Sequence, residues 1–326
     1  MRAVVLSGPG PVENLTLREL PLPAERPGWV RIRVEAFGLN RSELHTRLGL
    51  AEGVTFPRVP GIECAGVVDA APPASGLEPG QKVVTMMGGM GRVFDGGYAE
   101  YTSVPAPQVI PFRADLPWEI VGALPEMLQT AYGSLTTGLD LRPGQSLLIR
   151  GGTSSVGMAA AALAKQLGAT VFSTTRRPER AAELARHGVD HPIVDGGRIA
   201  DAVRGIVPQG VDAALELVGT PTLPDTLRSV RVHGTVCFTG MLSNEWLVKD
   251  FYPIGYIPTG VRLTAYGGEA SDLPAAAFQR LLDAIAAGRL QVAVHKVYDG
   301  LDEIRQAHAD LEANAAVGKL VVRVRR

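Results

Sequence analysis

The sequence has few cysteines, no long apolar run and almost no excess of charge of either sign. Of its 326 residues only Cys64 and Cys237 are cysteines, and they lie too far apart for a four-cysteine zinc lobe or a disulfide framework. No run reaches the roughly 18 apolar residues of a membrane-spanning helix. A net charge of −1 disfavours nucleic acid or an anionic membrane surface as the main partner.

The first ten residues, MRAVVLSGPG, turn to Gly and Pro too early for a signal peptide. With 46% hydrophobic and 20% charged residues, the composition is that of an ordinary soluble globular protein. The length favours about two domains, on a prior of roughly 150 residues each. We therefore expect a cytoplasmic protein with two buried cores and reduced cysteines.

The sequence pattern changes near residue 116. Before that point, short strands alternate with Gly- and Pro-rich turns. Segments such as WVRIRVEAFGL (29–39) and GRVFDGGYAEYTSV (91–104) partly alternate apolar and polar residues. This pattern predicts a β-rich domain, either barrel-like or a sandwich.

Beyond residue 116, apolar strands alternate with helical stretches, which predicts βαβ units and a parallel sheet. From about residue 260 the alternation fades. The predicted strands are SLLIR, TVFSTT, HPIVD, VDAALELVG and GTVCFTGM, with helices over 156–168, 178–187, 198–206 and 221–231, followed by strands over 262–266 and 319–324 and helices over 272–290 and 302–314.

A glycine-rich loop, GGTSSVG, follows the first of these strands and precedes a helix of small residues. A helix N-terminus has unpaired N–H groups and a partial positive charge, so it binds phosphate when the backbone can come close. The middle glycine of G-x-G-x-x-G is replaced by serine, so a turn without ligand stays an alternative, and whether the serine hydroxyls contact a pyrophosphate stays open. The predicted cofactor-binding residues here are Gly151, Gly152, Thr153, Ser154, Ser155, Val156 and Gly157.

The second strand ends in STTRRPER, which we call the basic turn (residues 173–180). A site for NAD would have Asp or Glu about 20 residues after the glycines, to accept the ribose 2′-OH. Arginines occupy that region instead, and arginine can bind a 2′-phosphate through a bidentate pair. The sequence thus predicts NADPH, with a solvated turn as the alternative. The residues concerned are Thr174, Thr175, Arg176, Arg177 and Arg180.

Six segments together resemble the medium-chain dehydrogenase/reductase superfamily, and most of all its zinc-independent NADPH:quinone oxidoreductase branch. They are AFGLNRSELHTRLG, FPRVPGIECAGVV, FDGGYAEY, LPEMLQTAYGSL, GGTSSVG and the closing GKLVV, and the resemblance covers nearly the whole chain. It implies a GroES-like β-barrel catalytic domain over residues 1–116 and 260–326. It also implies a Rossmann domain, a doubly wound parallel sheet that binds NADPH, over 117–259, and a homodimer formed through the sheets of the nucleotide domains.

The resemblance also predicts whether the chain has the ligands of a catalytic zinc ion. Zinc alcohol dehydrogenases of this superfamily have Cys where this chain has Asn40 and His where it has Ile62, and isoleucine cannot coordinate an ion. Glu63 stands beside the second position and Glu126 at that of the third ligand, but two carboxylates alone would hold zinc poorly. We expect no metal. Without this Lewis acid, reduction of an electrophilic acceptor is favoured over oxidation of an alcohol.

The same resemblance implies the catalytic residues. Asn40 would contact the nicotinamide and the substrate, because an amide both donates and accepts. Ser42 and His45 keep the spacing of a proton relay and are neighbours on a helix, and a His with a pKa near ~6.5 suits proton delivery. The alternatives are that Asn40 only caps a turn and that His45 lies on the surface of a polar helix.

Further cofactor contacts are carried over by resemblance. Lys319 is among them, although a lysine in the last strand could face water. Glu63 is expected to hydrogen-bond backbone or a neighbouring arginine and not to act in catalysis. His187 and His191, with H-x3-H spacing, flank a helix–strand turn, and we expect no metal there. The cofactor contacts are Thr130, Gly240, Met241 and Lys319.

An apolar stretch after the fifth strand would either line a flat substrate site or pack in the core or a dimer. The leading hypothesis for function is an NADPH-dependent reductase of quinones or similar activated carbonyls and alkenes. The second is an enoyl reductase acting on enoyl thioesters or polyketide intermediates, and the third is a non-catalytic NADPH-binding protein. The apolar residues are Met241, Leu242, Trp246, Phe251, Tyr252 and Tyr256.

Overall fold

Strand β3 (Trp29–Gly38) is central to a seven-stranded sheet in the first of two units into which the chain divides. These units are Met1–Gln129 with Glu269–Arg326, and Thr130–Gly268. The structure is a computed structural model that describes residues 1–325. Side chains of β3 alternate between buried and half-buried along most of its length, as the sequence alternation predicts.

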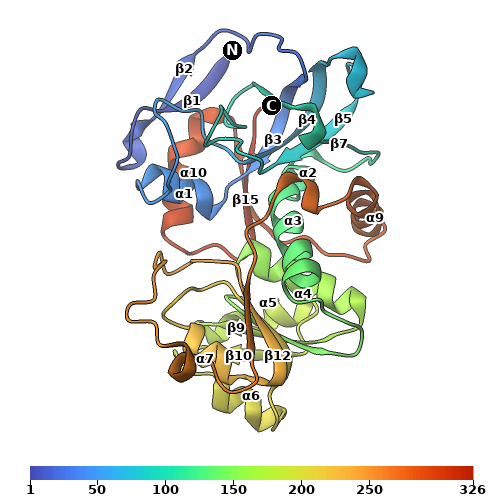
Figure 1. Cartoon of the computed structure of the whole chain (residues 1–326). Coiled ribbons are helices and arrows are strands. Elements are labelled where there is room, and N and C mark those ends of the chain that lie inside the picture. Colours follow the sequence, from blue (N-terminus) through green and yellow to red (C-terminus); the bar gives the residue numbers. More distant parts are fainter. Residues whose placement is uncertain (326) are drawn as a thin grey trace. The chain divides into compact units, whose positions relative to one another are not determined.

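The strand order of this sheet is β14-β15-β3-β4-β5-β7, and β6 pairs with residues 29–33 of β3. Figure 1 labels β3, β4, β5, β7 and β15 of this sheet. All of these pairs are antiparallel except β14 with β15. A separate antiparallel pair joins β1 (Arg2–Leu6) to β2 (Leu15–Glu19). The remaining bounds are β4 (Glu63–Ala70), β5 (Lys82–Met86), β6 (Tyr101–Pro105), β7 (Val109–Pro111), β14 (Val294–Asp299) and β15 (Lys319–Arg323).

The helices of this unit include α1 (Arg41–Arg47), which two residues separate from the end of β3. Strands and helices enclose one core, to which Val30, Ile32 and Phe37 contribute from β3. This core fixes the end of β3 and therefore the start of α1, where several predicted site residues lie. The other helices are α2 (Trp118–Val121), α3 (Pro125–Gly133, whose last residues belong to the second unit), α9 (Ala275–Ala286) and α10 (Ile304–Glu312).

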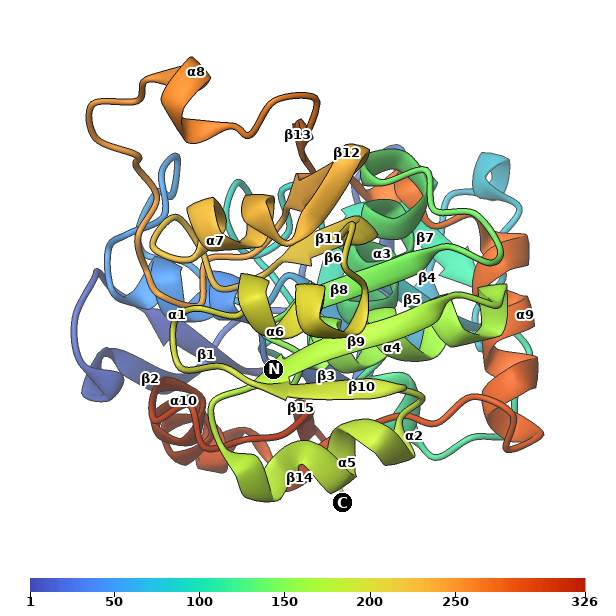
Figure 2. The same ribbon diagram turned by 90° about the horizontal axis from the view of Figure 1, so that it is seen from below.

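The second unit is a six-stranded, all-parallel sheet in the order β10-β9-β8-β11-β12-β13. Its central strands are apolar because both faces are covered. Figure 2 shows these strands side by side, with α4 and α5 on one face and α6 and α7 on the other. The strand bounds are β8 (Ser146–Arg150), β9 (Thr170–Thr175), β10 (His191–Val194), β11 (Val211–Glu216), β12 (Val230–Phe238) and β13 (Arg262–Ala265).

The helices of this unit follow the strands in turn: α4 (Ser155–Leu167), α5 (Ala181–Arg186), α6 (Ala200–Ile206), α7 (Leu223–Arg228) and the short α8 (Pro253–Tyr256). The structure confirms the predicted fold class, a GroES-like domain with a doubly wound parallel sheet. Among the helices of residues 1–325, none combines the length and apolarity that crossing a membrane requires.

Two local expectations need correction. The helix expected over 221–231 ends at Arg228, because Val230 already pairs with Val211 of β11 as the first residue of β12. The strand expected at 262–266 was assigned with the catalytic domain, but β13 pairs in parallel with β12. The parallel sheet therefore includes residues beyond 259.

Candidate functional site

The glycine-rich loop lies between β8 and α4 and is closely packed. Gly151 has φ +90°, a left-handed conformation that favours glycine. A Cβ on Gly157 would lie 2.6 Å from the carbonyl oxygen of Gly151 and 2.8 Å from that of Gly152. Backbone cannot yield to such a contact easily, so the loop depends on glycine at 157. This close approach brings the N-terminus of α4 against the end of β8.

The two serines of the loop have different environments. Ser154 is the N-cap of α4: its hydroxyl accepts from the Gly157 amide at 3.1 Å and donates to the Gly151 carbonyl at 2.8 Å. Ser155 is the first helical residue and is half-buried. Its amide is one of the helix-terminal donors that an anion can bind. Ser154 therefore stabilises the loop itself, and the loop fits a phosphate group.

The basic turn continues directly from β9, beside this loop. The Gly151 amide donates to the Thr174 hydroxyl at 3.1 Å, and the Gly152 amide donates to the Thr174 carbonyl. Thr175 hydrogen-bonds the backbone of Arg177 through its hydroxyl. Both threonines are buried. The Thr174 hydroxyl joins the turn to the loop, and the Thr175 hydroxyl stabilises the turn itself.

The arginines of the basic turn are close enough to repel one another. Arg176 and Arg177 are exposed, and Arg180 is half-buried. Burial lowers the pKa of Arg180, and the positive charges of Arg177 and Arg176 lower it further, while Glu179 opposes them. Like charges gathered in this way favour an anion beside them.

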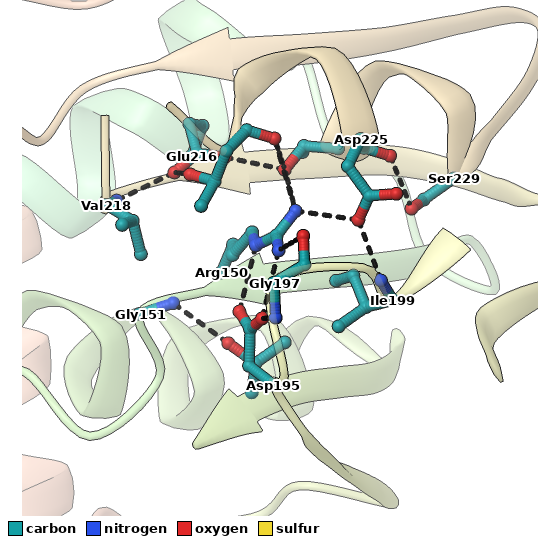
Figure 3. A network of polar contacts seen from close by, with 12 residues as sticks. Arg150, Gly151, Asp195, Gly197, Ile199, Glu216, Val218, Asp225 and Ser229 are labelled. Atoms are coloured by element: carbon teal, nitrogen blue, oxygen red, sulfur yellow. Dashed lines mark hydrogen bonds and ion pairs between the residues drawn. The ribbon is translucent and has the colours of Figure 1, made fainter. Parts of the chain in front are cut away.

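A buried network lies directly before the loop, and we call it the Arg150 network (Arg150, Asp195, Glu216, Asp225, Thr226; Figure 3). The Arg150 guanidinium forms a bidentate pair with Asp195, with both N–O distances 2.9 Å, and a third bond of 2.9 Å with Asp225. It also donates to the carbonyls of Thr222 and Gly197. Burial opposes the charge of Arg150, but Asp195 and the other acids raise its pKa above the ordinary value.

Glu216 completes this network at the end of β11. Its carboxylate accepts from the amides of Val218 and Gly219 at 2.7 and 3.0 Å and from the hydroxyl of Thr226. The loop after β11 is thus fixed to the same group of charges. Beyond β12, a Cβ on Gly240 would lie 2.7 Å from the Leu217 carbonyl oxygen, and Met241 beside it is half-buried. Carboxyl ends of parallel strands are where α/β sheets bind ligands.

The first unit contains its own buried group of charges, the buried polar cluster (Asn40, Glu43, Glu63, Glu126, Lys319). Lys319, the first residue of β15, is fully buried, and its ammonium donates to the Asn40 side-chain oxygen, to Glu63 at 2.7 Å and to Glu126 at 3.2 Å. Burial opposes this charge, but the carboxylates of Glu63 and Glu126 raise the pKa of Lys319. Lys319 therefore stays protonated and does not face water.

Asn40 is the N-cap residue of α1 and is nearly fully buried. Its side-chain amide donates to Glu63 at 2.9 Å, while its oxygen accepts from Lys319. The carboxamide is therefore held in one orientation. Glu63 also accepts from the Glu126 backbone amide at 2.7 Å, so the expected backbone bond is present, but the cation beside it is a lysine and not an arginine.

Glu43 closes the cluster from the first turn of α1. Its carboxylate accepts from the backbone amides of Asn40 at 2.9 Å and of Ile62 at 2.8 Å. Burial raises the pKa of Glu43 to about 7, although the hydrogen bond from the Ile62 amide opposes the shift. The Glu43 carboxyl is therefore protonated under mildly acidic conditions.

Ser42 and His45 also lie on α1. His45 is buried, with 6% of its surface exposed, which excludes a histidine on an exposed helix face. Ser42 is half-buried on the same helix. Thr130, in α3, is half-buried as well. His187 pairs with Glu183, and His191 stacks on Phe172.

The residues of the first unit do not fit a zinc ion. Ile62 is apolar, and the ammonium of Lys319 is bound to Asn40, Glu63 and Glu126 together. A second positive charge at those oxygens would be repelled. Within residues 1–325, no group of three or more His, Cys, Asp or Glu side chains could hold a metal ion.

Glu43 and Arg150 are not among the site residues predicted from the sequence. Each has a sequence feature that could have indicated it. Glu43 stands three residues after an Asn that follows a strand, which is the spacing of a capping box. Arg150 is a lone charge at the end of the apolar strand SLLIR. Asp195 and Asp225 could not be paired with it without knowledge of the strand order.

Two family models match the sequence. One, described as an alcohol dehydrogenase GroES-like domain, matches residues 26–114. The other, described as a zinc-binding dehydrogenase, matches residues 187–322.

Individual relatives are similar at low identity. Synaptic vesicle membrane protein VAT-1 homolog-like of Mus musculus is 26% identical, and the match covers 100% of this chain and 82% of the relative. A probable quinone oxidoreductase of Schizosaccharomyces pombe is 27% identical over 97% of this chain and 94% of the relative. A 2-haloacrylate reductase of a Burkholderia species is 28% identical over 99% and 98%. The structure of a mycobacterial protein complexed with NADPH superposes with a TM-score of 0.87 at 27% identity, covering 99% of each chain.

Proposed function

Because the chain belongs to the medium-chain dehydrogenase/reductase superfamily, in its quinone oxidoreductase branch, we propose that this oxidoreductase uses NADPH to reduce a quinone or a similar activated carbonyl or alkene, without zinc. NADPH supplies the hydride when it is bound. The nucleotide-binding sheet would hold the cofactor through the GGTSSVG loop and the basic turn, and the first unit would supply polar groups for the acceptor.

One observation carries the choice of NADPH: the clustering of Arg176, Arg177 and Arg180 just beyond β9. Their charges repel one another, and a 2′-phosphate beside them would relieve this repulsion. The similar mycobacterial structure complexed with NADPH supports the same choice. The residues Gly151, Gly152 and Thr153, with Ser155 and Val156 at the start of α4, would bind the pyrophosphate.

The acceptor would be handled by α1 and its surroundings. Lys319 and Glu63 hold the Asn40 carboxamide in one orientation, and this leaves one lone pair of its oxygen for a donor on cofactor or substrate. We assign proton delivery to His45 with Ser42, because both lie on α1 within five residues of Asn40. Thr130, Gly240, Met241 and Lys319 remain proposed contributors to the cofactor side.

A second candidate is an enoyl reductase that acts on enoyl thioesters or polyketide intermediates. The similarity to a 2-haloacrylate reductase supports an activated C=C bond as the acceptor. A non-catalytic NADPH-binding protein is the third candidate, and only measured turnover separates it from the other two.

A homodimer belongs to this proposal. Strand β13 ends the parallel sheet and pairs only with β12 among the described residues. Near it, large apolar side chains are exposed, including Leu247 at 82% and Ile254 at 84%. Exposed apolar surface of this kind is typical of interaction sites. We also propose a cytoplasmic location, which suits the free and buried Cys64 and Cys237.

The binding test compares two reduced cofactors on the full chain. Replacing Arg176 and Arg177 by glutamine should weaken NADPH binding about tenfold or more, with NADH nearly unaffected, because only NADPH carries the 2′-phosphate. Fluorescence titration gives both Kd values. Arg142→Gln is the matched control: Arg142 is exposed and precedes β8 at the opposite edge of the sheet. Equal losses for both cofactors, or none, would contradict the assignment.

A further inference from the structure

The Arg150 network brings an unusual amount of negative charge to the edge of the sheet where an anionic cofactor would bind. Asp195, Glu216 and Asp225 are all at least nine-tenths buried. Among the described residues, Arg150 is the only buried cation that contacts them, and Arg228, 3.6 Å from Asp225, is 58% exposed. Removing Arg150 would leave these carboxylates uncompensated.

Of the three acids in the Arg150 network, Asp195 lies nearest to the basic turn in the sheet register. Val194 of β10 pairs with Thr175 of β9, and the Asp195 amide donates to the Thr175 carbonyl at 2.8 Å. The next residues along the two strands are Asp195 and Arg176, so the register brings them side by side. Parallel strands project paired side chains to the same face of the sheet. A free carboxylate here would form ion pairs with the arginines of the basic turn.

The geometry prevents that pairing. Both oxygens of Asp195 are bound by the Arg150 guanidinium, and one of them also accepts from the Gly197 amide at 2.8 Å. Figure 3 shows the Asp195 carboxylate pointing to Arg150. The carboxylate is therefore neutralised by Arg150 and is unavailable to the basic turn.

We propose that Arg150 determines cofactor specificity as a positioning residue: by binding Asp195, it keeps the basic turn free for the 2′-phosphate of NADPH. This inference rests on the proposed function, since it concerns the choice between NADPH and NADH. Arg150 does not touch the cofactor in this account. It acts through Asp195 and the arginines of the turn.

The central variant is Arg150→Lys, measured on the full chain with NADPH and NADH. Lysine keeps the charge, but its single ammonium cannot bind both oxygens of Asp195 and also Asp225. Asp195 is then released toward the basic turn. The preference for NADPH should fall by about fivefold, mainly through a higher Kd for NADPH, because a nearby carboxylate both neutralises the arginines and repels the 2′-phosphate.

Two further variants separate this role from a merely structural one. Adding Asp195→Asn to Arg150→Lys removes the released charge and should restore the preference. Asp195→Asn alone should leave the preference within about twofold of the wild type, because that charge is already neutralised. Arg142→Lys controls for the loss of a guanidinium, because Arg142 is exposed and precedes the amino end of β8.

Three results would overturn the inference. One is equal weakening of NADPH and NADH in Arg150→Lys, which indicates general damage to the loop. Another is a double variant that does not regain its preference. The third is a clear gain in NADPH preference by Asp195→Asn alone. If Arg150→Lys does not fold, Arg150→Gln, alone and combined with Asp195→Asn, makes the same comparison with the same expected outcomes. A wild-type protein without preference for NADPH would contradict the proposed function first, before any variant is made.

Discussion

At the scale of single residues, the buried polar cluster shows how one lysine binds three oxygen-bearing side chains. Gly38, the last residue of β3, leaves the room for it: a Cβ there would lie 2.3 Å from the Lys319 Cε and 2.5 Å from a Glu63 oxygen. Burying an ammonium is costly unless each of its hydrogens finds an acceptor. Asn40, Glu63 and Glu126 provide three, so the cluster is held as one unit.

Glu43 makes the stability of the protein depend on pH. Its carboxyl keeps a proton up to about pH 7 in the folded state, against an ordinary value of 4.5. The folded protein therefore binds more protons than the unfolded chain in this window, so this group lowers stability as pH rises from 4.5 to 7. In Glu43→Gln, the decrease in the free energy of unfolding between pH 4.5 and pH 7 should be about 3 kcal/mol smaller than in the wild type. Urea unfolding at both pH values measures the difference.

The control for this prediction is Glu52→Gln, since Glu52 is exposed in the same unit. This variant should keep the wild-type dependence on pH. If Glu43→Gln kept it as well, the carboxyl of Glu43 would not titrate in this window, and its role in the cluster would need revision.

At the scale of elements, the sequence predicts the second unit well because its strands are short apolar runs that alternate with helices. Predictions failed where tertiary pairing decides. The segment after α7 becomes strand at Val230 because β11 is there to pair with it. The sixth strand, β13, follows a long connection, and only its pairing with β12 reveals its sheet. In the same way, single-sequence patterns could predict the loop and the basic turn but not the partners of Arg150.

The junction of β8 and α4 gives a test at this scale. Gly157→Ala would place a Cβ 2.6 Å from the Gly151 carbonyl oxygen, which forces the loop away from the helix N-terminus. We expect NADPH binding to weaken about tenfold or more, with a modest loss of stability. Fluorescence titration and thermal unfolding measure the two effects.

Gly205→Ala, in α6 of the same sheet unit, is the matched control because a Cβ there meets nothing within 4 Å. It should leave cofactor binding unchanged and stabilise the helix slightly, by roughly 0.5–1 kcal/mol. Unchanged NADPH binding in Gly157→Ala would argue that the loop does not hold the pyrophosphate.

At the scale of the whole molecule, two kinds of polar organisation share one chain. The GroES-like unit buries a lysine-centred cluster beside α1, and the parallel sheet has the glycine-rich loop, the basic turn and the Arg150 network at the carboxyl ends of its strands. The resemblance visible in the sequence already implied both units and most of the proposed contacts. The acceptor does not follow from it, because the same apolar stretch after β12 is compatible with a flat substrate site and with packing in the core or in a dimer.

The most direct measurement is NADPH oxidation by the full chain, with a chelator present, against a small quinone and a crotonyl thioester in parallel, and with NADH as the comparison. We expect turnover of the quinone that the chelator does not affect, and a much lower rate with NADH. Turnover of the thioester alone would move the protein to the enoyl reductases. No turnover of either acceptor despite tight NADPH binding, or equal rates with NADH, would contradict the proposed function.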